Sequence, residues 1–184
     1  MALTTKQRRL MKELDMVFSG LELDYWNAER WPPKWKSARL EVALRWVVRG
    51  EVVHQYMLVD ELLACRLCWY FFGKRPFPKL WRTDKFKLFN YHVIEELSLM
   101  PKLRFVKSIS GVPKAIAADI ERLNSLRNAL AHSFFPENLK RYKPMWKGRE
   151  IFSAAGFALF SEDMEKIREF FKDVFQASKR QSGI

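Results

Sequence analysis

The sequence is poor in the residues that build metal sites and disulfides. It has two cysteines and three histidines in 184 residues. Zinc needs four ligands, and the histidines are distant in sequence from Cys65 and Cys68, so we expect no metal and no cofactor. The C-x-x-C spacing lies on an apolar helical pattern, without the preceding strand of a thioredoxin-like protein. We interpret both cysteines as core residues, which suits a reducing cytosol.

Long apolar runs and several common catalytic motifs are also missing. No uncharged apolar stretch reaches the roughly 18 residues of a membrane span. The N-terminal MALTTKQRRLMKELD lacks the apolar centre of a signal peptide. A phosphate-binding glycine-rich loop, HExxH and GxSxG are absent, as are internal repeats and domain linkers. We therefore expect one cytoplasmic domain over residues 1–184 with no membrane partner.

Basic and apolar residues, by contrast, are plentiful. The chain carries 33 Lys and Arg against 21 Asp and Glu, a net charge of +12. Hydrophobic residues make up 48% and aromatics 15%, which is enough for a sizeable core. The positive charge favours a polyanionic partner, whether RNA, DNA or an anionic surface, although basic proteins without one exist.

Helical periodicity dominates the chain and predicts an all-α fold. A helix beginning after Ser37 reaches Gly50, which either kinks or ends it. Pro101 separates two further helices, and Ser153 can cap the last one. A short extended piece is expected over 145–152. The predicted helices cover residues 5–18, 37–50, 51–72, 85–99, 102–109, a segment ending before Pro136, and 154–178.

Two connecting segments, 20–36 and 73–84, mix aromatic and basic residues. Such segments can hold a phosphate backbone and stack bases. They can equally be ordered connectors whose rings pack on the core, which is commoner. For 73–84 the second interpretation places Phe77 and Trp81 against the core.

The segment before Pro136 carries an apolar stripe at helical spacing: Ile116, Ile120, Leu123, Leu126 and Leu130. Arg127 falls on the edge of this stripe, and His132 falls nearly opposite it, with Asn128 beside it. Pro136 ends the helix, because the residue before a proline disfavours the α conformation. His132 is therefore expected in the last turn, where the helix dipole favours its protonated form.

The R-N-A-L-A-H sequence, with four residues between Arg127 and His132, resembles the motif of the HEPN superfamily. The resemblance covers roughly residues 40 to 140 and includes an apolar helix and an immediate proline stop. It implies an up-and-down helical bundle with a core of about 37–140, to which helices 5–18 and 154–178 are added. It also implies a twofold dimer and, in the family's nuclease members, metal-independent RNA cleavage by Arg127, Asn128 and His132.

The chemistry of these side chains is consistent with that activity. Cleavage through the 2′-hydroxyl needs a base, an acid and a cation for the developing phosphorane charge. Histidine can exchange protons near neutral pH, and arginine offers a fixed fork to phosphate oxygens. A dimer would bring two His132 side chains together to divide the acid and base roles. The face carrying Glu121, Ser125 and Asn128 is mostly uncharged, which suits a dimer surface.

Other interpretations of the same residues stay open. The motif could pin the dimer of a non-catalytic module that binds nucleic acid or protein, such as an antitoxin or a regulatory protein. A DNA-binding regulator is a third possibility. Asp60 and Glu61 lie on an apolar helix and need partners unless they are solvated, and Arg127 is a candidate partner. The basic run after the motif is either a nucleic-acid-binding segment or a solvated face; it comprises Lys140, Arg141, Lys143, Lys147 and Arg149.

Overall fold

The computed structural model describes residues 5, 33–75, 77–131 and 144–173. It divides into two compact units, Met1–Val47 and Val48–Ile184. Most of the described residues are helical, and the strands among them form one two-stranded sheet, so the all-α prediction is confirmed. The expected helix over 5–18 and the chain after residue 173 lie outside the described residues, apart from Thr5.

The first long helix, α2 (Pro33–Phe72), is longer than the sequence pattern predicts. It begins at Pro33, a residue whose fixed φ suits the first helical position, so the predicted cap at Ser37 is wrong. The helix also continues through Gly50, which neither interrupts nor ends it. Its end agrees with the prediction, because Gly73 follows Phe72 with a φ of +75°. Leu44 and Val47 of this helix are 49% and 68% exposed.

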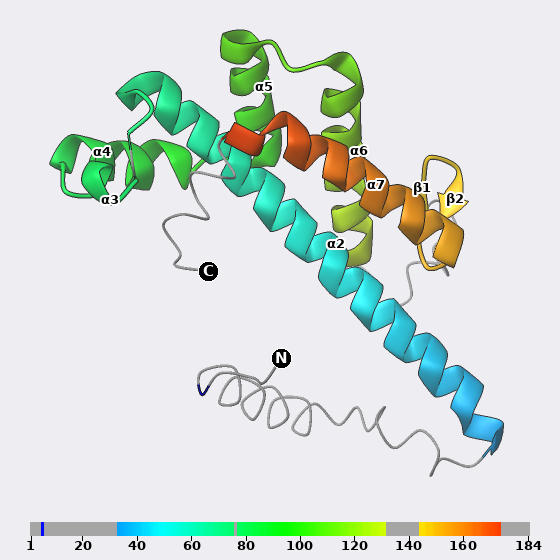
Figure 1. Ribbon diagram of the computed structural model, residues 1–184. Helices are drawn as coiled ribbons and strands as arrows, with labels where there is room; N and C mark the ends of the chain where they lie inside the picture. The colour runs from blue at the N-terminus through cyan, green and yellow to red at the C-terminus, as the bar shows by residue number, and fades with distance from the viewer. Residues whose placement is uncertain (1–4, 6–32, 76, 132–143, 174–184) are drawn as a thin grey trace. The chain divides into compact units, whose positions relative to one another are not determined.

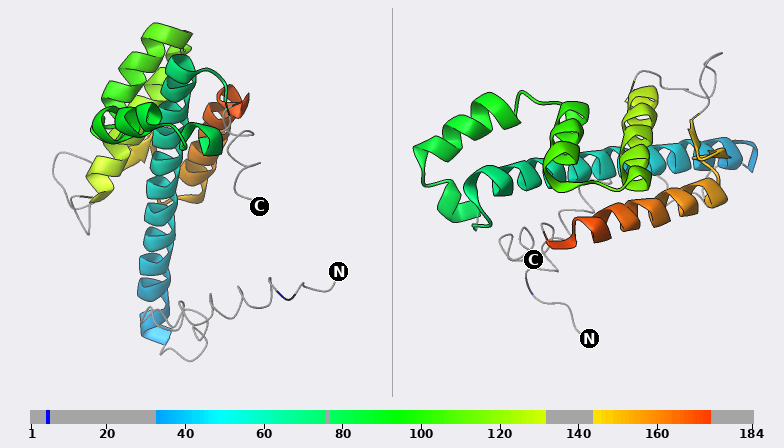
Figure 2. Two further views of the ribbon diagram at one scale, coloured as in Figure 1. Left: turned by 90° about the vertical axis from the view of Figure 1, so that its left-hand side faces the viewer. Right: turned by 90° about the horizontal axis from the view of Figure 1, so that it is seen from above.

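Four helices supply most of the core of the second unit: α2, α5 (Leu99–Ser110), α6 (Lys114–Ala131) and α7 (Ala154–Phe170). Figure 1 and Figure 2 show α7 running alongside α2, with α5 and α6 also packed against that helix. A hydrogen bond also joins α7 to α2, because Arg168 of α7 donates to the side-chain oxygen of Gln55 on α2. The buried side chains include Leu62, Leu63, Leu67, Leu103, Val106, Ile120, Leu123, Leu126, Phe160, Met164 and Ile167.

Between α2 and α5 the chain forms α3 (Phe77–Leu80), α4 (Asp84–Phe89) and the π-helix η2 (Asn90–Ile94). Phe77 packs against the core, as the connector interpretation of 73–84 predicts, whereas Trp81 stays 39% exposed. The predicted break at Pro101 is wrong, because α5 begins at Leu99 and contains Pro101 in its first turn. A proline costs no helical hydrogen bond there. Gly111 ends α5 with a φ of +64°.

A small β-hairpin precedes α7 and confirms the extended piece predicted for 145–152. Strands β1 (Met145–Trp146) and β2 (Arg149–Glu150) pair antiparallel around Lys147 and Gly148. Both turn residues have positive φ, +44° and +83°, which a two-residue type I′ turn requires. Ser153 then caps α7, because its Oγ accepts from the Gly156 backbone N–H at 3.0 Å, as the sequence predicts.

The two cysteines are free and buried in α2, which confirms their interpretation as core residues. Burial raises the pKa of Cys65, and the nearby Glu61 carboxylate raises it further. Burial likewise raises the pKa of Cys68 to about 12. Neither thiol is therefore a ready nucleophile at neutral pH. None of the described helices has the length and apolar character needed to cross a membrane.

Candidate functional site

Arg127 lies near the C-terminal end of α6 and is held by two neighbours. Its Nη1 donates to Asn128 Oδ1 at 3.0 Å, and its guanidinium carbon lies 4.8 Å from the centre of the Tyr56 ring on α2. The side chain is half-buried, as expected at the edge of the stripe formed by Leu123, Leu126 and their neighbours. No carboxylate among the described residues pairs with Arg127. The guanidinium thus keeps most of its N–H donors for an anion.

Of the interpretations left open for Asp60 and Glu61, pairing with Arg127 is not observed. Asp60 is bound by Lys102 of α5, at 2.6 Å between Oδ2 and Nζ. Glu61 is exposed and accepts a weak hydrogen bond from the Cys65 thiol at 3.5 Å. The physical reason is position along α2: Arg127 stacks on Tyr56, one turn before Asp60, so Lys102 reaches the acid instead.

Lys102 is a residue that sequence reasoning missed. It lies in the buried face of α5 with Leu99, Leu103 and Val106 and is itself buried. A buried ammonium needs an acid, so a lysine within an apolar stripe was the available signal. The Asp60 Oδ1 atom is buried without a hydrogen-bond partner among the described residues.

His132, the predicted acid–base residue, lies just beyond Ala131 and outside the described residues. Lys140, Arg141 and Lys143 of the basic run lie outside them as well. The structure therefore places the Arg127–Asn128 half of the predicted site.

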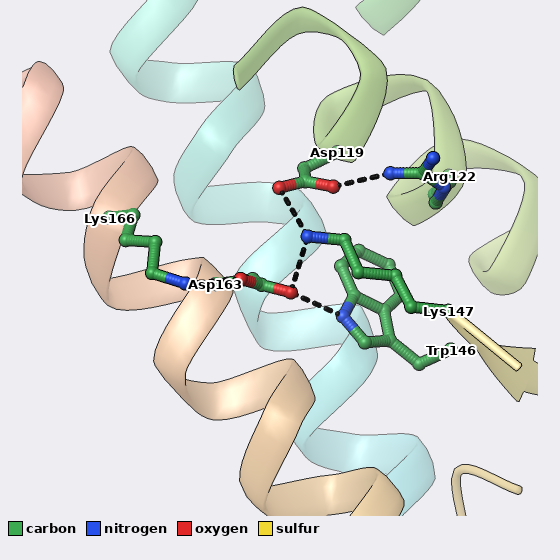
Figure 3. A network of polar contacts seen from close by, with 6 residues as sticks. All are labelled: Asp119, Arg122, Trp146, Lys147, Asp163 and Lys166. Atoms are coloured by element: carbon green, nitrogen blue, oxygen red, sulfur yellow. Dashed lines mark hydrogen bonds and ion pairs between the residues drawn. The ribbon is translucent and has the colours of Figure 1, made fainter. Parts of the chain in front are cut away.

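Lys147 does not behave as a free cation for a phosphate backbone, and this part of the prediction is wrong. Its Nζ lies 2.9 Å from Asp119 Oδ2 on α6 and 2.7 Å from Asp163 Oδ2 on α7. Figure 3 shows the ammonium between the two carboxylates. The positive charge of Lys147 is balanced by these two carboxylates, and both acids are almost completely buried. Arg149, in contrast, is exposed on β2 and makes no ion pair with described residues.

The two aspartates extend this contact into a network (Figure 3). Asp119 also binds Arg122 at 2.6 Å. Asp163 accepts from the Trp146 indole N–H at 2.9 Å and binds Lys166 at 2.8 Å. The network ties α6, the hairpin and α7 together, and it also holds Lys147 at its positive φ, a position that asparagine and glycine usually fill.

Charge pairing in this network shifts two pKa values. Burial disfavours the charged form of Lys147, but its hydrogen bonds to Asp163 and Asp119 outweigh burial and raise its pKa. Burial likewise opposes the Asp163 carboxylate, but hydrogen bonds from Lys147, Lys166 and Trp146 outweigh it and lower its pKa to about 2. Both groups are therefore charged across the neutral range. A network of charged, mutually satisfied groups is suited to stability and not to proton transfer near pH 7.

No protein-family model, curated protein or solved structure matches this chain.

The two clusters differ in what they can do chemically. In the cluster of Asp119, Lys147 and Asp163, each charged group is paired within the protein, with Arg122 and Lys166 as further partners of the two acids. The pair of Arg127 and Asn128 is different. The described contacts of the Arg127 guanidinium are the Asn128 amide and the Tyr56 ring, so its charge is not balanced by a carboxylate among the described residues. Among the described residues, no group of three His, Cys, Asp or Glu side chains is arranged to hold a metal ion.

Proposed function

We propose that the protein is a metal-independent endoribonuclease in which Arg127 binds the scissile phosphate and His132 transfers protons. One observation carries this proposal. Arg127 is held by Asn128 and Tyr56, without a carboxylate partner among the described residues, five positions before His132. A guanidinium positioned in this way can stabilise the charge that develops on a phosphorane.

Each residue of the motif has a distinct role in the proposed reaction. One histidine removes the proton of the RNA 2′-hydroxyl, whose oxygen attacks the adjacent phosphorus. A protonated histidine donates to the leaving 5′-oxygen, so that the products are a 2′,3′-cyclic phosphate and a 5′-hydroxyl. Arg127 pairs with the non-bridging oxygens, and Asn128 orients Arg127 through its side-chain oxygen.

The proposal includes a homodimer, because one motif supplies one histidine. A twofold pair of α6 helices would bring two His132 side chains to a shared cleft. The half-buried Asn128 and the exposed Ser125 lie on the face that would meet the partner. Light scattering at micromolar concentration should give twice the mass of 21.9 kDa, and a monomer would count against the shared cleft.

The test is RNA digestion by wild-type protein and by His132→Ala over pH 5.5 to 8.5, with and without EDTA. General acid–base catalysis contributes about 10²–10⁴-fold, so His132→Ala should lose roughly that much activity. His92→Ala is the matched control, since this exposed histidine lies on η2 and should leave cleavage unchanged. Absence of cleavage by wild-type dimer, or full activity in His132→Ala, would falsify the nuclease. Loss of cleavage in EDTA, with rescue by Mg²⁺, would refute the metal-independent mechanism.

Arg127→Ala should also lose RNA-cleavage activity, on the order of 10²-fold, as is found when one donor that stabilises transition-state charge is removed. Arg127→Lys should restore little, because an ammonium cannot reproduce the planar fork. Both variants should keep the wild-type circular dichroism spectrum, since Arg127 balances no buried acid among the described residues. Activity equal to wild type in Arg127→Ala would remove Arg127 from the reaction.

The alternative is a non-catalytic module that binds nucleic acid or a protein such as an antitoxin. It is favoured by the contact between Arg127 and Asn128, which by itself is an ordinary stabilising pair. This alternative predicts retention of RNA on a filter without any cleavage, and equal retention by His132→Ala. Cleavage that disappears with His132 excludes it.

A further inference from the structure

We propose that the surface formed by α3, α4 and η2 docks the protein on an anionic phospholipid bilayer. The centre of this docking surface consists of three exposed side chains, Trp81, Leu88 and Tyr91. The inference is independent of the proposed RNA cleavage and takes up the anionic surface that the net charge of +12 favours as a partner. The contact needs no membrane-spanning segment, and the expectation of no membrane partner rested on the absence of such segments.

The three side chains at the centre of the docking surface lie next to one another. Leu88 and Tyr91 are 59% and 48% exposed, and their spacing of three residues puts them on one side of the continuous α4–η2 segment. Trp81 is 39% exposed, and its ring centre lies 6.0 Å from that of Tyr91. Tryptophan and tyrosine are enriched at the boundary between lipid and water, and an exposed leucine beside them can enter the acyl region.

A layer of packed rings lies beneath the docking surface and holds its elements together (Figure 1). The ring centre of Phe86 on α4 lies 5.3 Å from that of Phe72 on α2 and 6.2 Å from that of Phe77 on α3. Phe86 is itself buried. Because these rings occupy the inner side of the α4–η2 segment, Leu88 and Tyr91 project from its outer side, where a partner can cover them.

Cations flank this centre without acidic partners. Lys79, Arg82 and Lys85 are exposed, and no carboxylate among the described residues pairs with them. The only acid of α4, Asp84, pairs with Lys87 at 3.4 Å. Lys85 lies one turn before Leu88, and Arg82 directly follows Trp81. Each lysine or arginine close to an anionic leaflet strengthens binding about fivefold.

The mixture of apolar and cationic side chains favours a bilayer over other polyanionic partners. An RNA strand contacts cations and the flat faces of rings. Leu88, the most exposed of the three central side chains, is neither. A second copy of the docking surface is disfavoured, because it would bring like charges together. A bilayer of anionic phospholipid offers head groups for the cations and acyl chains for the apolar side chains at the same time.

The test is co-sedimentation of the full chain with vesicles of phosphatidylcholine alone, or of an equal mixture of phosphatidylcholine and phosphatidylserine. Wild type should bind the mixed vesicles reversibly and the neutral ones weakly, since permanent anchoring requires a second signal such as a lipid chain. The double variant Arg82→Gln and Lys85→Gln should weaken binding about 25-fold, through two lost cations. Leu88→Gln should weaken it about 10-fold, because one apolar side chain no longer inserts.

Two matched controls change the same kinds of side chain on other helices. The double variant Arg104→Gln and Lys114→Gln removes the same net charge at exposed residues of α5 and α6. Met57→Gln replaces an apolar side chain that is 65% exposed on α2. Both controls should keep wild-type binding, because they leave the docking surface intact. All variants should keep the wild-type circular dichroism spectrum, since every substituted side chain is exposed.

Weaker vesicle binding by the double variant of Arg82 and Lys85 and by Leu88→Gln, with both controls unchanged, supports the docking surface. Equal weakening by the two double variants would show adsorption through net charge alone and would overturn the proposal. Unchanged vesicle binding in Leu88→Gln, or no binding of wild type to the mixed vesicles, would also overturn it. If Leu88→Gln weakens binding of a 2′-O-methyl oligoadenylate but not of vesicles, the surface belongs to RNA instead.

Discussion

At the scale of single residues, Lys147 joins two buried acids and should matter for stability. Lys147→Met would leave Asp119 and Asp163 with only Arg122 and Lys166 as counter-charges. Breaking a buried ion pair by removing one partner costs about 3 kcal/mol. We expect a loss of that order in the free energy of unfolding, measured with urea. Arg149→Gln, on the neighbouring strand, is the control and should change it by less than about 0.5 kcal/mol. Equal stability of the two variants would contradict the role of Lys147.

Asp163 should make the stability depend on acid pH. Its pKa in the folded protein is about 2, below the ordinary value of 3.8. A lowered pKa contributes stability that is fully present above the unfolded value and is lost as pH falls from about 4 through 2. The loss should be about 2 kcal/mol, followed by urea unfolding at successive pH values. Asp163→Asn should remove this step, whereas Asp84→Asn, at an exposed residue of α4, should retain it. The same step in Asp163→Asn would assign it to another acid.

At the scale of elements, the joint between the hairpin and α7 depends on a glycine. A Cβ added at Gly156 would lie 1.9 Å from the Glu150 carbonyl oxygen. This oxygen belongs to the backbone and cannot move away at a small cost in free energy. Gly156→Ala should therefore destabilise the protein by about 3 kcal/mol. Gly50→Ala is the matched substitution inside α2, where a Cβ meets nothing within 4 Å. It should raise stability by up to about 1 kcal/mol. Melting temperatures that move in the same direction for both variants would contradict the close approach at Gly156.

At the scale of the whole molecule, the net charge of +12 should make RNA binding depend strongly on salt. Each phosphate contact to a single strand contributes about 0.7 to the slope of log affinity against log salt. Neutralising Lys140, Arg141 and Lys143 together should therefore reduce the slope by about 2 if they contact the backbone. Lys147→Gln should leave the slope unchanged, because Lys147 is already balanced by two aspartates. An unchanged slope in the triple variant would make the run a solvated face.

The sequence by itself determined the features that depend on local interactions. The helical class, the stripe through Leu123 and Leu126, the extended piece before α7 and the Ser153 cap all follow from residues within a few positions of each other. Helical period and capping act over one or two turns, so the order of residues is enough to predict them. The half-buried position of Arg127 followed from the same periodicity.

Only the tertiary structure decided which charges meet. Asp60 binds Lys102, 42 residues away, and Lys147 binds Asp119 across 28 residues. A carboxylate can pair with any cation that packing brings within about 4 Å, and no local pattern encodes that choice. For the same reason the sequence misassigned Lys147 as a phosphate contact and could not decide whether Arg127 pairs with Asp60 or Glu61. Helix packing sets these partners, since it fixes which faces of α2, α5, α6 and α7 lie against one another.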